Sequence, residues 1–297
     1  MNLVQLERRP IGAYPQVPLV ALDSVWFQVA GTLCNLECTH CFISSSPTNR
    51  SFEMMTEAEV AAHLEEARGL GVRAYYFTGG EPFLNKAMVP ILARTLAQGP
   101  ACVLTNGIPI TARLAGELSR LSAGSEYSLE LRISIDGYDA QSNDPIRGEG
   151  SFEKILLGVG RLAEVGLNPV ITVTEACEGV ASRAGRLKFL EVLRALGLSQ
   201  PRLKILPLLR MGAEEKRLRP YQAHETLAGV ELDRAAIDKL ECGHARMVTK
   251  KGVYVCPILI DHPGARLAAT LTESLVPFGL SYSACYTCHA EGLSCAT

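Results

Sequence analysis

The chain has 297 residues, of which 47% are hydrophobic and 20% are charged. This length and composition suit one large domain and a smaller one, each with its own core, and exclude a disordered or fibrous protein. The 29 Lys and Arg residues nearly balance the 31 Asp and Glu residues. This balance argues against nucleic acid or an anionic membrane as a partner and favours a small-molecule or short-peptide substrate.

The first 22 residues predict a surface extension rather than an export signal. Pro10, Pro15 and Pro18 interrupt them before an apolar run reaches the length of a signal peptide. No stretch of the chain approaches the roughly 18 consecutive apolar residues that span a bilayer. We therefore expect a cytoplasmic protein without membrane contact, whose ten cysteines are ligands, catalytic groups or core residues rather than disulfides.

From residue 23 onward, short β-rich runs alternate with longer segments that have apolar residues at helical spacing. The expected strands are 24–30, 72–77, 101–105, 129–135, 168–174 and 202–207. The expected helices are 55–71, 85–99, 110–124, 151–166 and 183–197. This repeated βα pattern predicts an α/β fold with a parallel sheet. At roughly 30 residues per βα unit, the segment holds six units, which predicts a partial (β/α)6 barrel.

The alternation ends near residue 208, and the sequence becomes rich in cysteine towards its end. The predicted organisation is therefore an N-terminal extension, a partial barrel and a small cysteine-rich α+β domain, over residues 1–22, 23–207 and 208–297. Parallel βα folds carry their chemistry in the loops that follow the carboxyl ends of the strands. Those loops are where we look for functional residues.

The first predicted strand ends directly before three cysteines, Cys34, Cys38 and Cys41, with the spacing C-x3-C-x2-C. A structural zinc site is closed by four protein ligands, whereas three ligands leave one coordination position for a reacting molecule. Taken alone, the triplet also fits three reduced structural cysteines, or a zinc site completed by His40.

The second predicted strand runs into the sequence TGGEP, Thr78 to Pro82. Paired glycines let the backbone come close to a ligand, and the carboxylate of Glu81 can accept hydrogen bonds from an ammonium group. A solvated turn would explain these residues equally well if they stood alone.

Together, the two motifs resemble those of the radical S-adenosylmethionine (radical SAM) superfamily. The resemblance implies that the three cysteines bind three irons of a 4Fe–4S cluster, and that S-adenosyl-L-methionine (SAM) chelates the fourth iron. It also implies a flavodoxin- or ferredoxin-type electron donor and a 5′-deoxyadenosyl radical that abstracts hydrogen from the substrate. The family usually has an aromatic residue directly before the third cysteine, and His40 takes that place here.

Further strand ends agree with this resemblance, because TNG follows the third predicted strand and SIDG closes the fourth. The residues that the resemblance implies at SAM are His40, Thr78, Gly79, Gly80, Glu81, Asn106, Ser134, Asp136 and Arg147. For Arg147, a solvent-facing loop cation is an equally good explanation.

The tail holds five cysteines, and a separated pair followed by C-x2-C suffices for a closed four-ligand site such as a zinc ribbon. Given the first motif, the tail resembles the auxiliary-cluster extensions called SPASM and twitch. The SPASM pattern has seven cysteines, so the resemblance implies one twitch-like auxiliary 4Fe–4S cluster. Its expected ligands are Cys242, Cys256, Cys285 and Cys288. Cys295 either replaces one of them, leaves the site when substrate binds, or is a free thiol.

Two more residues, Glu175 and Cys177, follow the fifth predicted strand on the catalytic rim. By the same resemblance, Cys177 is a candidate to return a hydrogen atom to a substrate radical, as in some peptide epimerases of the superfamily. A packed loop cysteine is the alternative. Cys102 is expected in the core, and His244 and His289 are expected to be hydrogen-bonded neighbours of the tail cysteines.

Three classes of function follow from these motifs. The first is the two-electron oxidation or rearrangement of a small metabolite, such as a sugar or cyclitol alcohol, with the auxiliary cluster taking one electron. The second is peptide modification by thioether formation or epimerisation. The third is a non-enzymatic zinc-binding module, which leaves TGGEP and SIDG unexplained. The N-terminal extension is short for a separate peptide-binding domain, which favours the small metabolite.

Overall fold

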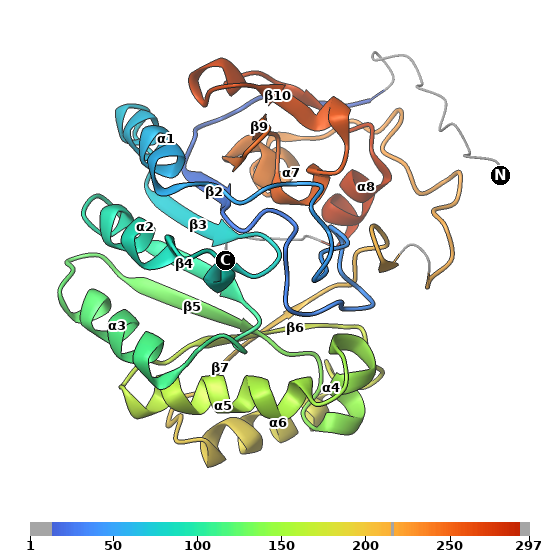
Figure 1. Cartoon of the computed structure of the whole chain (residues 1–297). Helices are drawn as coiled ribbons and strands as arrows, with labels where there is room; N and C mark the ends of the chain where they lie inside the picture. The colour runs from blue at the N-terminus through green and yellow to red at the C-terminus, as the bar shows by residue number, and fades with distance from the viewer. Residues whose placement is uncertain (1–13, 215–216, 292–297) are drawn as a thin grey trace.

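The computed structural model describes residues 14–214 and 217–291 (Figure 1). Within them, one sheet has nine strands in the order β10-β9-β8-β2-β3-β4-β5-β6-β7. Six parallel strands follow one another along the chain: β2 Ser24–Gln28, β3 Ala74–Thr78, β4 Ala101–Thr105, β5 Leu129–Ser134, β6 Val170–Thr174 and β7 Arg202–Leu206. Each begins and ends within two residues of its predicted range, and the α/β class is confirmed.

Helices lie between these strands where the sequence predicts them: α1 Glu57–Gly69, α2 Met88–Thr95, α3 Ala112–Ala123, α5 Ser151–Glu164 and α6 Arg183–Ala195. Figure 1 shows them along one side of the parallel strands. The start of α1 illustrates how local sequence sets an end, because Thr56 and Glu59 form a capping box. The Thr56 hydroxyl accepts from the Glu59 amide, and the Glu59 carboxylate accepts from the Thr56 amide.

One further helix, α4 Ala140–Arg147, is not predicted by the sequence pattern. It is only eight residues long and contains Pro145, which cannot donate a backbone hydrogen bond and normally ends a helix. Its start is stabilised by Asp139, whose carboxylate accepts from the Ser142 amide at 2.8 Å. This helix matters for function because it carries Arg147.

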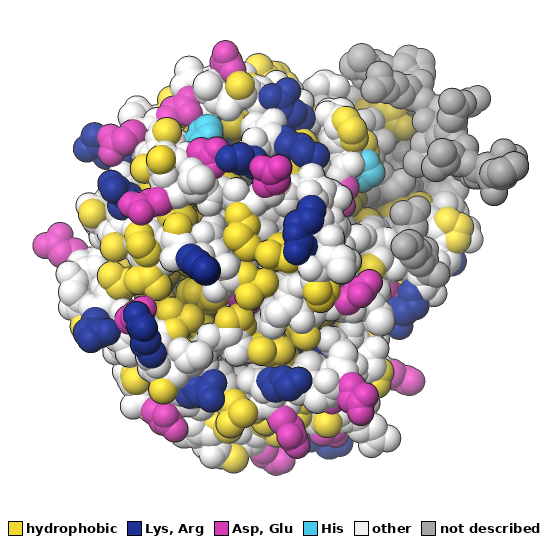
Figure 2. Space-filling view, viewed as in Figure 1, with side chains coloured by type: hydrophobic (Ala, Val, Ile, Leu, Met, Phe, Trp, Pro, Cys, Tyr) yellow, Lys and Arg dark blue, Asp and Glu magenta, His cyan; other side chains and the backbone are white. Residues whose placement is uncertain are grey.

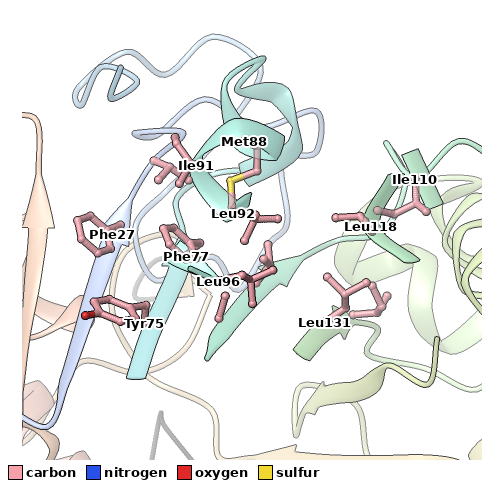
Figure 3. Packing of buried hydrophobic residues seen from close by; sticks show 14 of the residues in the cluster. Phe27, Tyr75, Phe77, Met88, Ile91, Leu92, Leu96, Ile110, Leu118 and Leu131 are labelled. Carbon is pink, nitrogen blue, oxygen red and sulfur yellow. The ribbon is translucent and has the colours of Figure 1, made fainter. Parts of the chain in front are cut away.

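The main hydrophobic core lies between the sheet and these helices. In Figure 3, Phe27, Tyr75 and Phe77 point from β2 and β3 towards α2. The rings of Phe27 and Phe77 stack with their centroids 5.4 Å apart, and both side chains are fully buried. Burying one such side chain contributes about 1.5–3 kcal/mol, so this packing holds β2 and β3 rigidly side by side.

The tail continues the same sheet. Its strand β8 Ala245–Thr249 lies parallel to β2, and β9 Gly252–Tyr254 and β10 Arg266–Ala268 extend the sheet in antiparallel fashion. A separate short pair joins β1 Gln16–Val17 to β11 Phe278–Gly279. The remaining helices are α7 Arg234–Ile237 and α8 Ser283–Ala290, and the 3₁₀ turns are η2 Pro82–Leu84, η4 Glu241–Gly243, η5 Pro257–Leu259, η6 Pro263–Ala265 and η7 Thr272–Ser274. The boundary near residue 208 stays a prediction, but the sheet runs across it.

A second hydrophobic core joins the tail to the start of the chain. It combines Trp26 of β2 and Phe52 with tail residues such as Met247 and Tyr254. The surface is mixed, because Figure 2 shows Lys and Arg interspersed with Asp and Glu over the face in view. No helix in residues 14–214 and 217–291 has the length and apolarity to cross a bilayer.

Candidate active site

The three-cysteine loop leaves the carboxyl end of β2 and folds back on itself. The Cys34 amide donates to the Ser46 carbonyl at 3.1 Å, and the Cys41 amide donates to the Cys38 carbonyl at 3.2 Å. All three thiols are free, with Cys34 buried and the other two partly buried. Burial raises the pKa of Cys34 to about 12 and that of Cys38 to about 11. Neutral thiols of this kind become thiolates when a metal binds and displaces their protons.

The glycines of TGGEP pack against this loop. The Gly80 amide donates to the Gly31 carbonyl at 2.8 Å, and the Glu81 amide donates to the Leu33 carbonyl at 2.9 Å. A Cβ atom on Gly80 would lie 2.0 Å from the Leu33 carbonyl oxygen, so only glycine allows this approach. The close packing places the carboxyl end of β3 directly beside the cysteines.

Glu81 is fully buried, and its carboxylate ties the end of β3 to the end of β4. It accepts hydrogen bonds from the Thr105 hydroxyl at 2.6 Å, the Asn106 amide at 2.7 Å and the Phe83 amide at 3.1 Å. Burial raises the pKa of Glu81 to about 7, because these neutral donors only partly offset the loss of water. A carboxylate offers about four acceptor positions, so one remains for a further donor.

Asn106 brings the end of β4 to the cysteine loop. Its side-chain amide donates to the Asn35 side-chain oxygen at 2.7 Å and lies 3.7 Å from the Cys34 sulfur. Sequence reasoning selected Asn106 but not Asn35, since an asparagine inside a cysteine loop carries no signal by itself. The two asparagines fix the position of Cys34 relative to β4.

A buried ion cluster lies on the other side of the cysteine loop, where His40, Asp136 and Arg147 meet. The Asp136 carboxylate lies 2.6 Å from His40 Nε2 and 2.8 Å from Arg147 Nε, and it accepts from the Thr174 amide at 2.9 Å. Burial alone would raise the pKa of Asp136, but Arg147 and His40 outweigh it and hold that pKa at about 2. The predicted alternative for Arg147, a solvent-facing cation, is wrong because the side chain is buried.

This ion cluster also faces the cysteines. The positive charge of Arg147 lowers the pKa of Cys38, although burial still dominates. His40 Nδ1 is buried without a hydrogen-bond partner among the described residues. The arrangement therefore offers a fixed cation and one unsatisfied ring nitrogen beside the three thiols.

The other predicted rim residues are more scattered. Thr78 and Ser134 end β3 and β5 at the same edge of the sheet and are partly exposed. The Cys177 thiol donates to the Ser142 carbonyl of α4 at 2.9 Å, and burial raises its pKa. Glu175 is exposed and forms no ion pair within the described part of the chain.

Sequence reasoning missed the segment that follows β7. The Ala213 amide donates to the Cys41 carbonyl at 2.9 Å, and Gly212 has a φ of +61°. A Cβ atom on Gly212 would lie 2.3 Å from the Phe42 carbonyl oxygen. A single glycine after a strand is too common a signal to have revealed this contact.

The tail cysteines form a second group around one cavity. It is lined by Cys242, Cys256, Cys285 and Cys288 together with apolar residues such as Val255, Ile258 and Leu280. Burial raises the pKa of all four thiols, to about 11 for Cys256 and about 12 for Cys288. Cys295 lies outside the described residues.

Two further predictions concern single residues, Cys102 and His244. Cys102 is buried in β4, with its thiol 3.8 Å from Glu130 Oε1, in agreement with a core position. His244 Nδ1 lies 3.0 Å from Asp23 Oδ2.

Across residues 14–214 and 217–291, no three His, Cys, Asp or Glu side chains converge in the manner of a single-ion site. Each thiolate of a four-iron cluster binds a different iron, so its sulfurs need not meet at one point.

A family model described as the radical SAM superfamily matches residues 29–177. Among curated proteins, the AdoMet-dependent heme synthase of Nitratidesulfovibrio vulgaris is 31% identical over 165 residues, which are 55% of this chain and 43% of that protein. The mycofactocin maturase MftC of Mycolicibacterium smegmatis is 31% identical over 134 residues, 45% of this chain and 32% of that protein. This chain therefore spans less than half the length of these relatives.

Among solved structures, Streptococcus suis SuiB bound to the precursor peptide SuiA matches with a TM-score of 0.65 at 13% identity. The match covers 87% of this chain and 64% of that chain. At this level of identity, the likeness concerns the fold.

Proposed function

The chain belongs to the radical SAM superfamily, and from that premise we propose that Cys34, Cys38 and Cys41 bind its catalytic 4Fe–4S cluster. Membership of this family implies that the chain uses such a cluster together with SAM. The observation that carries the assignment is the packing of a loop with three free thiols against the Gly-Gly-Glu turn, at neighbouring strand ends. The six parallel strands would then be the partial barrel, with its chemistry at the carboxyl edge.

The donor set fits such a cluster. Three soft thiols are available and none is used in a disulfide, while Arg147 supplies positive charge next to Cys38. A 4Fe–4S cluster held by these thiols would supply the single electron for reductive cleavage of the sulfonium bond of SAM, the source of the 5′-deoxyadenosyl radical. The protein's part is to hold these groups and to exclude water from them.

For SAM, we propose that Glu81 receives the ammonium group at its one remaining acceptor position. An ammonium beside the buried carboxylate would stabilise its ionised form, which the neutral donors around it do only in part. Asn106, Asp136, Arg147 and His40 lie on the two sides of the cysteine loop and would line the remainder of the SAM site. Thr78, Gly79, Gly80 and Ser134 complete the proposed set.

We propose that residues 208–297 hold one auxiliary 4Fe–4S cluster. The support is the cavity lined by Cys242, Cys256, Cys285 and Cys288, whose other walls are mostly apolar. Four thiols close such a site without a further ligand, so Cys295 would be an extra thiol. This centre would accept an electron from the substrate radical.

The proposed reaction is the two-electron oxidation of a small metabolite. One hydrogen atom would pass to the 5′-deoxyadenosyl radical to form 5′-deoxyadenosine, and the substrate radical would then give one electron to the auxiliary cluster and one proton to water. A flavodoxin- or ferredoxin-type protein would supply the electron that starts each turnover. Cytoplasmic location stays a prediction.

Peptide modification is the second candidate. It is favoured by the 31% identity to a mycofactocin maturase and by the shared fold with SuiB, which was solved with a precursor peptide. In that case Cys177, on the rim after β6, would be the candidate hydrogen-atom donor and Glu175 its neighbour. The identity to a heme synthase favours a small molecule to a similar degree.

The test is anaerobic reconstitution of the full chain, followed by iron and sulfide analysis and incubation with SAM and a reductant. We expect about eight iron atoms per chain and formation of 5′-deoxyadenosine. Candidate metabolites and peptides that carry deuterium are then added, and the true substrate transfers deuterium to 5′-deoxyadenosine. Stoichiometric zinc without iron would refute the assignment.

Glu81→Gln is expected to weaken SAM binding by about one to two orders of magnitude, the equivalent of a charged hydrogen bond of ~1.5–3 kcal/mol. The amide keeps the size of the side chain but lacks its charge. Iron content should stay unchanged, and SAM binding is measured by titration calorimetry.

Thr105→Val is the matched control for Glu81→Gln. It removes one donor to the carboxylate and keeps the carboxyl group itself. It should weaken SAM binding less than tenfold, in line with a neutral hydrogen bond of about 0.5–1.5 kcal/mol. Equal losses in the two variants would show that Glu81 acts through the fold rather than through the ammonium group.

A further inference from the structure

Arg246 lies on β8 and is fully buried. Its guanidinium donates to four backbone carbonyls, those of Ser274 at 2.9 Å and of Cys242, Ala245 and Val276 at 2.8 Å each. No carboxylate within the described ranges forms an ion pair with it. The side chain is thus hydrogen-bonded, but its charge is not balanced.

An unbalanced buried guanidinium is unusual. Taking such an ion out of water costs several kcal/mol even after relaxation, and carbonyl dipoles offset only part of this cost. Two other buried arginines, Arg132 and Arg147, each lie 2.8 Å from a carboxylate oxygen, of Glu130 and Asp136 respectively. A guanidinium stays protonated in proteins at neutral pH, so Arg246 has its full positive charge.

The tail residue that carries a thiol and contacts Arg246 is Cys242. The Nη1 atom of Arg246 donates to the backbone carbonyl of Cys242 at 2.8 Å, so the guanidinium lies beside the backbone that carries this thiol. Cys242 and Cys256 both line the cavity at η4, η5 and α8. Thiolates that bind a metal in this cavity would bring negative charge close to the guanidinium.

We propose that Arg246 is the counter-charge of the metal centre bound by the tail cysteines, and that it sets the reduction potential of that centre. The inference rests on the proposed auxiliary cluster. A cluster bound by four thiolates has a net negative charge, and reduction adds another electron in a cavity whose other walls are mostly apolar. A fixed cation hydrogen-bonded to the backbone of one ligand, Cys242, stabilises the reduced form most and so raises the potential.

The test compares Arg246→Gln, which removes the charge, with Arg246→Lys, which keeps it; both lose part of the carbonyl hydrogen bonding. The full chain is loaded with iron and sulfide, and the potentials of both clusters are measured by redox titration with electron paramagnetic resonance. Arg246→Gln should lower the ratio of reduced to oxidised auxiliary cluster at a given potential at least tenfold, ~59 mV for one electron. Arg246→Lys should stay within a few-fold of the wild type.

The cysteine-loop cluster is the internal reference and should not shift in either variant. Arg132→Gln, which removes a buried arginine whose charge is already paired with Glu130, should leave the auxiliary potential unchanged. Equal auxiliary potentials in the Gln and Lys variants would overturn the proposal, because a purely structural role affects both alike.

If a variant loads poorly, the iron retained in the tail becomes the measurement. The proposal then predicts that Arg246→Lys retains more iron than Arg246→Gln, and equal loss would overturn it. If the tail binds no auxiliary cluster at all, the wild type itself should load only about four iron atoms. That result is therefore distinguishable from a failure of the Arg246 proposal.

Discussion

Simultaneous replacement of Cys34, Cys38 and Cys41 by Ala is expected to remove about half of the bound iron and all formation of 5′-deoxyadenosine. These thiols are the only protein ligands proposed for the catalytic cluster, and SAM has no iron to bind without it. Iron analysis after anaerobic reconstitution and chromatographic detection of 5′-deoxyadenosine measure the two effects. The auxiliary cluster, held by other residues, should still load.

Cys102→Ala is the matched control for the triple variant. Cys102 is buried in β4 and lines neither cysteine site, so its loss should leave iron content and SAM cleavage unchanged. A triple variant that still cleaved SAM would show that the catalytic cluster is bound elsewhere. Loss of all iron in the triple variant, with the fold intact by circular dichroism, would contradict two independent sites.

Cys256→Ala is expected to lower the iron content from about eight to about four atoms per chain. The Cys256 side chain is buried in the wall of the tail cavity, and a site with three remaining thiols is no longer closed. The catalytic cluster should still cleave SAM, but 5′-deoxyadenosine should form without the oxidised product. Iron analysis and the ratio of product to 5′-deoxyadenosine measure this uncoupling.

Cys295→Ala tests whether Cys295 is a ligand of the auxiliary cluster. Four other thiols are available to close the site, so this variant should retain most of its iron and its coupled turnover. If Cys295→Ala loses the auxiliary cluster while Cys288→Ala retains it, Cys295 belongs to the ligand set and Cys288 does not. If neither Cys256→Ala nor Cys288→Ala changes the iron content, the tail binds no cluster.

The two cysteine sites are joined through β2. The carboxyl end of this strand leads into the three-cysteine loop, and its edge pairs with β8, which starts three residues after Cys242. The indole N–H of Trp26, in the middle of β2, donates to the carboxylate of Glu241 at 3.1 Å. Glu241 directly precedes Cys242 in the sequence. A rigid parallel strand pair thus fixes the position of one site relative to the other.

Much of this protein is determined by sequence features that act locally. The six parallel strands, five of the helices and the position of the three-cysteine loop after β2 follow from side-chain periodicity and from turn and cap residues. These features depend on neighbours within a few positions of the chain, which the sequence displays directly. The spacing of the cysteines and the TGGEP turn are also local features of the sequence, and they sufficed to identify the family.

Other features were decided only by tertiary structure, because they depend on groups far apart in the chain. His40 and Asp136 are separated by 96 positions, and their contact makes Arg147 a buried ion-pair partner rather than a surface cation. The parallel pairing of β8 with β2 is another such feature. Side-chain periodicity can indicate that the tail contains a strand, but it does not indicate which strand that one pairs with. The role of Arg246 could not be predicted from the sequence either, because an unbalanced charge is defined by its surroundings, here the loss of water and four backbone carbonyls.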